Sequence, residues 1–217
     1  SRALRAILRQ DPDIIMIGEM RDTETAQIGV QSALTGHLVL STLHTNTAAS
    51  AITRLEDMGV ERYLITSSVN GVLAQRLVRT LCNACKEPVE LGVDYIRDVG
   101  LGPFVDDATS QIVYKAQGCQ ACSHSGYSGR TGIHELFALD QNMHRVIMSG
   151  ADATLLHEAA RKQGMVTLYE DGLRKVVQGV TSMEEVLRVT QDQSEGAAEM
   201  PDEAIEPEVP MAEPATA

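Results

Sequence analysis

The chain has 217 residues, of which 43% are apolar and 22% are charged, and this composition is typical of a globular protein. The formal net charge is −12, and most of it lies in residues 191–217, which hold eight acids and no Lys or Arg. The apolar runs are too short for a membrane span, and no basic stripe with interleaved aromatics indicates a nucleic-acid surface. We therefore expect one good core with a small second unit, followed by an acidic disordered tail at 191–217.

Predicted strands and helices alternate along the first 80 residues. Ile14–Ile17 predicts a strand that is buried on both faces, and residues 37–43 predict a second strand. Helices are expected at 23–35, capped by Asp22 or Thr23 and stopped by Gly36, then at 46–59 and at 61–79. This order predicts an α/β fold in which helices cover a parallel sheet.

The pattern changes near Leu81, where cysteines and glycines replace the long periodic elements. A strand is expected at 132–139, and four helices are expected at 142–149, 153–163, 169–178 and 182–190. Their predicted N-caps include Asp140, Asp152 and Thr181, and Thr181 with Glu184 fits the capping-box pattern. The predicted segments are therefore 1–80, 81–132, 133–190 and the tail at 191–217.

Polar side chains follow both predicted strands of the sheet. Glu19 and Arg21 come after the first strand, and Thr42 and His44 come at the end of the second. Ligands of open parallel sheets bind at the carboxyl ends of the strands, so we expect these side chains to face one place. A carboxylate can orient or deprotonate a water, and His or Arg can stabilise charge on a phosphoryl oxygen. Taken singly, each residue could equally be a helix cap or a surface group.

The four cysteines form two C-x2-C pairs, Cys82 with Cys85 and Cys119 with Cys122, and 33 residues separate the pairs. Each pair can direct two thiolates at one tetrahedral ion, so together they predict a closed, structural Zn²⁺ site. Disulfides, a redox pair or an empty site are the alternatives, and the lack of an export signal favours a reducing compartment. His124 could replace one ligand, but we expect it to be an exposed loop residue.

Two further features have two readings each, and a third has one. The glycine-rich residues 126–136 could form an anion nest, but a tight return before the next strand is favoured. Arg76 and Arg79 would lie near a helix C-terminus, where they could balance the helix dipole or reach another subunit. Met143, Met148 and Met165 are expected to be core or packing residues.

Three stretches carry a resemblance to a known family: LRAILRQDPDIIMIGEMRD at 4–22, ALTGHLVLSTLHTNTA at 33–48 and AQRLVRTLC at 74–82. They resemble the second half of the nucleotide-binding domain of the ATPases of type II secretion and type IV pilus assembly, a branch of the P-loop NTPases. The resemblance extends from about Leu4 to Thr190. It implies a partial RecA-like sheet in segment 1–80, with a Walker B box and a histidine box, a zinc subdomain at 81–132 and a helical subdomain at 133–190.

The resemblance also implies roles for single residues. Glu19 would be the catalytic glutamate that polarises the attacking water, and His44 would lie near the γ-phosphate of ATP. Arg21 and Thr42 would contact the bound ATP and Mg²⁺. Gly18 stands where many P-loop proteins have an Asp linked to Mg²⁺, so that acid is expected elsewhere.

The phosphate-binding loop is expected upstream of this sequence. None of the 17 glycines begins a G-x-x-x-x-G-K-[ST] motif. By the family's spacing, that loop would lie about 60–70 residues upstream. We therefore expect the 217 residues alone not to bind or hydrolyse ATP appreciably.

The function implied by the resemblance is that of the C-terminal part of a hexameric cytoplasmic ATPase. It would power type II secretion, by pseudopilus extension, at the cytoplasmic face of the inner membrane, and a type IV pilus assembly ATPase is the alternative. The implied partners are five further copies and the platform and cytoplasmic-anchor proteins of the inner membrane, without nucleic acid. Two other classes remain: a non-catalytic zinc-binding interaction module and a nucleic-acid-translocating P-loop motor, which the acidic balance opposes.

Overall fold

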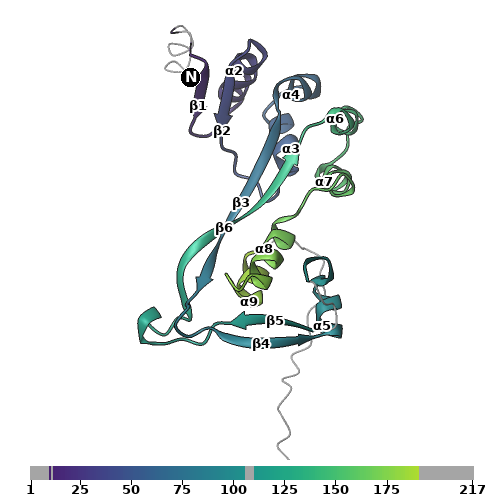
Figure 1. Cartoon of the computed structure of the whole chain (residues 1–217). Helices are drawn as coiled ribbons and strands as arrows, with labels where there is room; N and C mark the ends of the chain where they lie inside the picture. The colour runs from purple at the N-terminus through teal and green to yellow at the C-terminus, as the bar shows by residue number, and fades with distance from the viewer. Residues whose placement is uncertain (1–9, 11, 106–109, 191–217) are drawn as a thin grey trace, which may run out of the picture.

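The computed structural model describes residues 10, 12–105 and 110–190. At one end of the molecule, β1 (Ile14–Ile17) and β2 (Leu38–Ser41) pair in parallel, as predicted (Figure 1). The connecting helix α2 (Thr23–Leu34) starts at Asp22, whose carboxylate accepts the N–H of Thr25 at 2.8 Å. The predicted burial of β1 on both faces is wrong for the described residues. Ile15 is buried, but Met16 is 78% exposed, because no described element covers that face.

A long twisted ribbon runs through the middle of the molecule (Figure 1). It consists of β3 (Gly71–Leu81) and β6 (Tyr127–Ala138), which pair antiparallel from Gly71 with Ala138 to Leu81 with Tyr127. Residues 132–138 of the strand predicted at 132–139 lie in β6, which confirms that strand. The predicted boundaries after residues 80 and 132 both fall inside this ribbon, and the division into segments stays a prediction.

The helix predicted over 61–79 is wrong. Only α4 (Arg62–Ser68) is helical, and the chain then continues as β3. Val72, Ala74 and Val78 fall on alternate positions and face the core, which is the period of a strand. The apolar residues also match a helical spacing, so the end of α4 was not visible in the pattern.

Five described helices contribute to the core beside the upper half of the ribbon. They are α2, α3 (Ser50–Asp57), α4, α6 (Gln141–Met148) and α7 (Ala153–Lys162), and Phe137 of β6 is fully buried in the same core. The predicted N-caps Asp140 and Asp152 are confirmed, since each carboxylate accepts a backbone N–H three residues later. Met143 is buried as predicted, whereas Met148 is 51% exposed and not a core residue.

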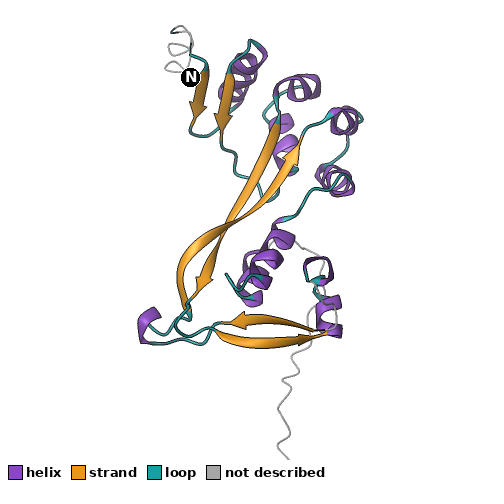
Figure 2. Ribbon diagram, viewed as in Figure 1, coloured by secondary structure: helices purple, strands orange, loops and turns teal. Residues whose placement is uncertain are grey.

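A second core lies beside the lower half of the ribbon. There β4 (Glu87–Gly92) and β5 (Ser110–Lys115) form an antiparallel pair that the sequence did not reveal. With α5 (Val93–Asp98) and the 3-10 helix η1 (Gly102–Phe104), they pack on α8 (Leu168–Val177) and α9 (Met183–Thr190). Figure 2 shows α5, α8 and α9 along one side of the orange β3–β6 ribbon. No helix among the described residues, 10, 12–105 and 110–190, has both the length and the apolar character to cross a membrane.

Arg76 and Arg79 lie on β3 and not at a helix end, so their predicted position is wrong. Both tie the ribbon to α9: Arg76 donates to the carbonyl of Val189 at 2.7 Å, and Arg79 pairs with Glu185 at 2.6 Å. The carboxylate of Glu185 is buried and also accepts from Arg188 of the same helix.

The predicted cap of α9 is off by one residue. The hydroxyl of Ser182 accepts the N–H of Glu185 at 3.3 Å, whereas the hydroxyl of Thr181 donates to the carbonyl of Arg79 at 2.8 Å. The predicted acidic tail, 191–217, lies outside the described residues.

Candidate functional site

The ends of β1 and β2 bring four predicted residues together, and we call this group the polar edge: Glu19, Arg21, Thr42 and His44. Arg21 Nη2 lies 2.6 Å from Oε1 of Glu19, and Nε2 of His44 lies 3.2 Å from its Oε2. The hydroxyl of Thr42 donates to the carbonyl of Gly18 at 2.6 Å, and the N–H of Met20 donates to the carbonyl of Thr42 at 3.0 Å. These two bonds hold the strand ends in register past the last ladder pair, so the carboxylate and the imidazole meet.

The electrostatics of the polar edge favour an ionised Glu19. The hydrogen bond from Arg21 holds the pKa of the Glu19 carboxyl below its ordinary value, and His44 adds to the effect. The side chains of His44 and Arg21 are 85% and 72% exposed, so both can reach a ligand from solvent. A carboxylate held in this way can accept a proton or a hydrogen bond from a water at neutral pH.

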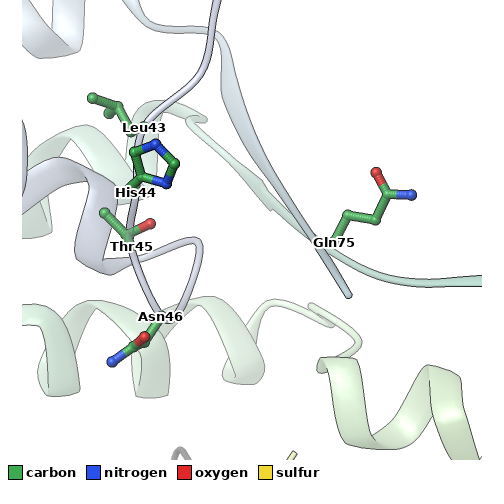
Figure 3. Close-up of a pocket in the computed structure, with 5 residues that line it drawn as sticks. All are labelled: Leu43, His44, Thr45, Asn46 and Gln75. Atoms are coloured by element: carbon green, nitrogen blue, oxygen red, sulfur yellow. The ribbon is translucent and has the colours of Figure 1, made fainter. Parts of the chain in front are cut away.

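A pocket of about 490 Å³ opens beside His44. Its lining residues are Leu43, His44, Thr45, Asn46 and Gln75. Figure 3 shows Gln75 set apart from the loop that carries the other four, with its side chain not directed at that loop. Sequence reasoning missed Gln75, because 61–79 was read as one helix. The strand period would have placed it on the outward face with Leu73 and Leu77, both of which are exposed.

The four cysteines come together at the far end of the ribbon, as their spacing predicts. Their sulfurs all lie within 4.8 Å of one another, and all four thiols are free. Two of the sulfur pairs, Cys85 with Cys122 and Cys119 with Cys122, are 3.8 Å apart. A tetrahedron with Zn–S bonds of about 2.3 Å has edges of about 3.8 Å, so the cluster has the size of a four-thiolate Zn²⁺ site.

Backbone amides donate hydrogen bonds to one sulfur of this cluster and favour its thiolate form. The N–H groups of Cys119 and Gly126 each donate to the sulfur of Cys122 at 3.2 Å. The bond from Cys119 contributes most to lowering the pKa of Cys122 to about 6, whereas burial raises the pKa of Cys85 to about 12. A bound cation would favour the thiolate at every position. His124 is exposed and is not part of the cluster, as expected.

The glycine-rich turn after Cys122 is a tight return, as favoured from the sequence. Gly126 has φ 75°, and a Cβ there would lie 2.6 Å from Cβ of Ala116, so only Gly fits. The next residue, Tyr127, already begins β6. The turn therefore delivers the chain from the cysteines directly into the ribbon.

Comparison with known proteins establishes the family. A family model described as "Type II/IV secretion system protein" matches residues 1–188. The chain belongs to this family. Its members include "Type II secretion system ATPase E" of Vibrio cholerae, which is 54% identical over 194 residues, and this match covers 88% of the chain and 37% of the relative. The predicted resemblance is therefore confirmed.

Other relatives come from both kinds of machine. "Type II secretion system protein HxcR" of Pseudomonas aeruginosa is 55% identical over 190 residues, covering 88% of this chain and 36% of the relative. "Type IV pilus assembly ATPase PilB" of Thermus thermophilus is 52% identical over 190 residues, covering 88% of this chain and 21% of the relative. The chain thus spans well under half the length of these relatives.

Solved structures agree on the fold. The pilus retraction motor PilT with bound ADP matches with a TM-score of 0.59 at 25% identity, covering 88% of this chain and 43% of PilT. The Legionella pneumophila ATPase DotB matches with a TM-score of 0.57 at 23% identity, covering 87% of this chain and 41% of DotB. The predicted α/β fold of a secretion ATPase is therefore confirmed.

Proposed function

We propose that this chain is the C-terminal part of a hexameric ATPase that powers type II secretion at the cytoplasmic face of the inner membrane. The observation that carries the proposal is the contact of Glu19 and His44 at the carboxyl ends of two parallel strands. Ligand sites of open parallel sheets form at such ends. The 54% identity to a type II secretion ATPase supports the same reading.

In the proposed reaction, Glu19 orients the water that attacks the terminal phosphate of ATP. Arg21 keeps the carboxyl of Glu19 ionised and, by holding Oε1, directs Oε2 of Glu19 toward His44. The imidazole of His44 then lies within reach of both the water and the phosphoryl oxygens, where it can stabilise the developing charge. Arg21 and Thr42 complete the nucleotide side of the site. Mg²⁺ would neutralise phosphate charge, and its protein ligands and the phosphate-binding loop would come from other segments of the longer protein.

The four-cysteine cluster is proposed to hold a structural Zn²⁺ ion. Cys82 follows β3 directly, and Cys122 lies five residues before β6 begins. A Zn²⁺ ion bound by all four thiolates would close the end of the ribbon and leave no open position for a substrate. Its role would therefore be to fix the ribbon and the β4–β5 pair, and not to catalyse a reaction.

The test is ATP turnover in the longer protein that contains this chain. We expect hydrolysis that is lost in Glu19→Gln while nucleotide affinity is kept. Normal turnover in Glu19→Gln would exclude the proposed role of the carboxylate. If the wild-type protein binds zinc but hydrolyses no ATP, the non-catalytic interaction module becomes the correct reading.

Type IV pilus assembly is the second candidate, because the Thermus thermophilus pilus ATPase is nearly as similar as the secretion ATPases. The polar edge would serve either machine with the same chemistry. Deletion of the gene separates the two: loss of exported proteins from the medium indicates secretion, and loss of surface pili indicates assembly. In either case we propose a homo-hexamer with platform and anchor proteins of the inner membrane as partners, and no nucleic acid.

A further inference from the structure

The interior contains one carboxylate of β6 that the proposed reaction does not use. Glu135 is fully buried, and its Oε1 accepts the backbone N–H of Ala48 at 3.0 Å. Within the described part of the chain, Oε2 accepts no hydrogen bond, and Nε2 of His157 on α7 lies 3.7 Å from it. Burying a carboxylate costs free energy, and the contacts of Glu135 with Ala48 and His157 offset part of this cost.

Ala48 belongs to the loop that presents His44 to the polar edge. The loop leaves β2 at Thr42, whose carbonyl accepts from Met20, and it enters α3 at Ser50. Inside it, the hydroxyl of Thr45 donates to the carbonyl of Thr47 at 3.0 Å. The Thr42 end is therefore fixed by Gly18 and Met20, just past the end of β1. The Ala48 end is fixed by Glu135, which lies 87 residues later in the sequence. His44, which is 85% exposed, lies between these two attachments.

We propose that Glu135 is a positioning residue for His44, an inference that rests on the proposed ATPase function. By holding Ala48, it fixes the far end of the His44 loop to β6, and through His157 it places α7 against the same carboxylate. The polar edge is thereby joined to the helical part of the chain by one buried group. Removing the acceptor leaves a buried N–H unpaired, so the loop, and not the whole fold, bears most of the effect.

Hydrogen–deuterium exchange of the Ala48 amide tests the attachment without any activity assay. Glu135→Gln retains an acceptor oxygen, whereas Glu135→Leu removes it and Glu135→Asp withdraws it by one methylene while keeping the charge. We expect Ala48 to exchange about tenfold faster or more in the Leu and Asp variants, relative to the ladder amides of the β3–β6 ribbon. The Gln variant should stay within about threefold of wild type. If Leu proves unable to fold, the contrast between Asp and Gln still decides.

The matched control is Glu185→Gln, at the other buried glutamate. Glu185 contacts Arg188 and, on β3, both the backbone N–H and the guanidinium of Arg79, but it does not touch the His44 loop. Its variant should therefore leave the ratio of Ala48 exchange to that of the ladder amides other than Arg79 unchanged. An unchanged ratio in both Glu135→Asp and Glu135→Leu overturns the proposal. So does a Gln variant that exchanges as fast as Asp.

Turnover in the longer protein tests the link to His44. We expect Glu135→Asp to lower kcat for ATP hydrolysis about tenfold or more with little change in KM. Glu135→Gln, which retains the acceptor oxygen, should keep kcat near the wild-type value. A loosened Ala48 with normal kcat overturns the positioning role while the proposed ATPase function stands. If His44→Ala itself has normal turnover, the proposed role of His44 fails, and the exchange result for Glu135 remains as an independent structural finding.

Discussion

Glu19 and His44 are separated by 25 positions in the sequence, yet His44 Nε2 and Glu19 Oε2 stand 3.2 Å apart. Each follows a short strand, and the parallel pairing of the two strands forces their ends to the same side. The contact is therefore a property of the sheet. Most of the chemistry proposed here depends on it.

The first prediction concerns the Glu19 carboxylate. In the longer ATP-binding protein, Glu19→Gln should lower the turnover number about 100-fold or more, because the amide can neither take a proton nor orient water as the carboxylate does. Steady-state phosphate release gives the rate, and a fluorescent nucleotide gives the affinity, which should be unchanged. The control is Glu158→Gln, an exposed glutamate on α7 that should keep full activity.

The second prediction concerns the metal. Purified protein should contain about one zinc ion per chain by elemental analysis, because the four thiolates form one site. Cys119→Ser should lose the ion and lower the melting temperature, since the ends of the ribbon and of β4–β5 are then no longer joined. The control, His124→Ala, should keep the ion. Loss of zinc in His124→Ala would mean that the ligand set proposed here is wrong.

The third prediction is a pH dependence of stability that comes from Glu185. Burial tends to raise its pKa, but hydrogen bonds from Arg188 and Arg79 outweigh burial and lower it from 4.5 to about 2. A lowered folded-state pKa stabilises the fold above the unfolded pKa, and this contribution fades as the pH falls from about 4.5 toward 2. Because the guanidinium groups of Arg79 and Arg188 are partly exposed, solvent screening reduces this contribution at pH 7 to about 1–2 kcal/mol.

Urea denaturation measures this dependence. At pH 7, Glu185→Gln should unfold at lower urea than wild type, and the gap between the two should shrink as the pH falls below about 4.5. The neighbouring Glu184→Gln is the control, because Glu184 is exposed, and its variant should follow wild type. A gap of the same size at pH 3 and pH 7 would show that the charge of Glu185 is not what stabilises the fold.

The fourth prediction contrasts two helical glycines. A Cβ at Gly172 of α8 would lie 2.5 Å from Cγ1 of Val186, a buried, β-branched residue of α9. A Cβ at Gly29 of α2 would lie 2.6 Å from the terminal methyl of Met20, which can swing away. Gly172→Ala should therefore destabilise by about 1–3 kcal/mol, and Gly29→Ala should cost much less or stabilise, because Ala favours a helix. Thermal unfolding of both variants measures the difference, and equal effects would contradict it.

Features that carry a recognisable sequence pattern were predictable, and pairings without one were not. The caps at Asp22, Asp140 and Asp152 follow from residues close together in the sequence. The parallel pair and the cysteine cluster join distant residues, but each has a pattern: strand–helix–strand order for the first and two C-x2-C pairs for the second. The strand β3 was missed, because its apolar residues fit a helix as well, and only its partner β6 decides between the two. The pair β4–β5 was missed because both strands are short and lie in a segment rich in loops.

The site divides in the same way. The meeting of Glu19, Arg21, Thr42 and His44 follows from strand ends, since parallel strands end at one edge, whereas their roles were expected from the family resemblance. Gln75 reaches the pocket only because β3 is a strand, and Glu135 reaches Ala48 only through the packing of β6. No residue spacing in the sequence indicates that Gln75 lines the pocket or that Glu135 contacts Ala48. In the sequence, Glu135 is simply an acidic residue within a predicted strand.

The pairing of Leu81 with Tyr127 makes residues 82–126 the tip of a hairpin, although this segment is much longer than an ordinary turn. By connectivity alone, the tip could be cut out and the two strands rejoined by a short turn. By packing it could not, because Leu173 and Val176 of α8 share one core with Ile96, Leu101 and Val113 of that tip. In a shortened chain, Leu173 and Val176 would form an exposed apolar patch along α8. Such a chain would remain soluble only if these two positions were made polar at the same time.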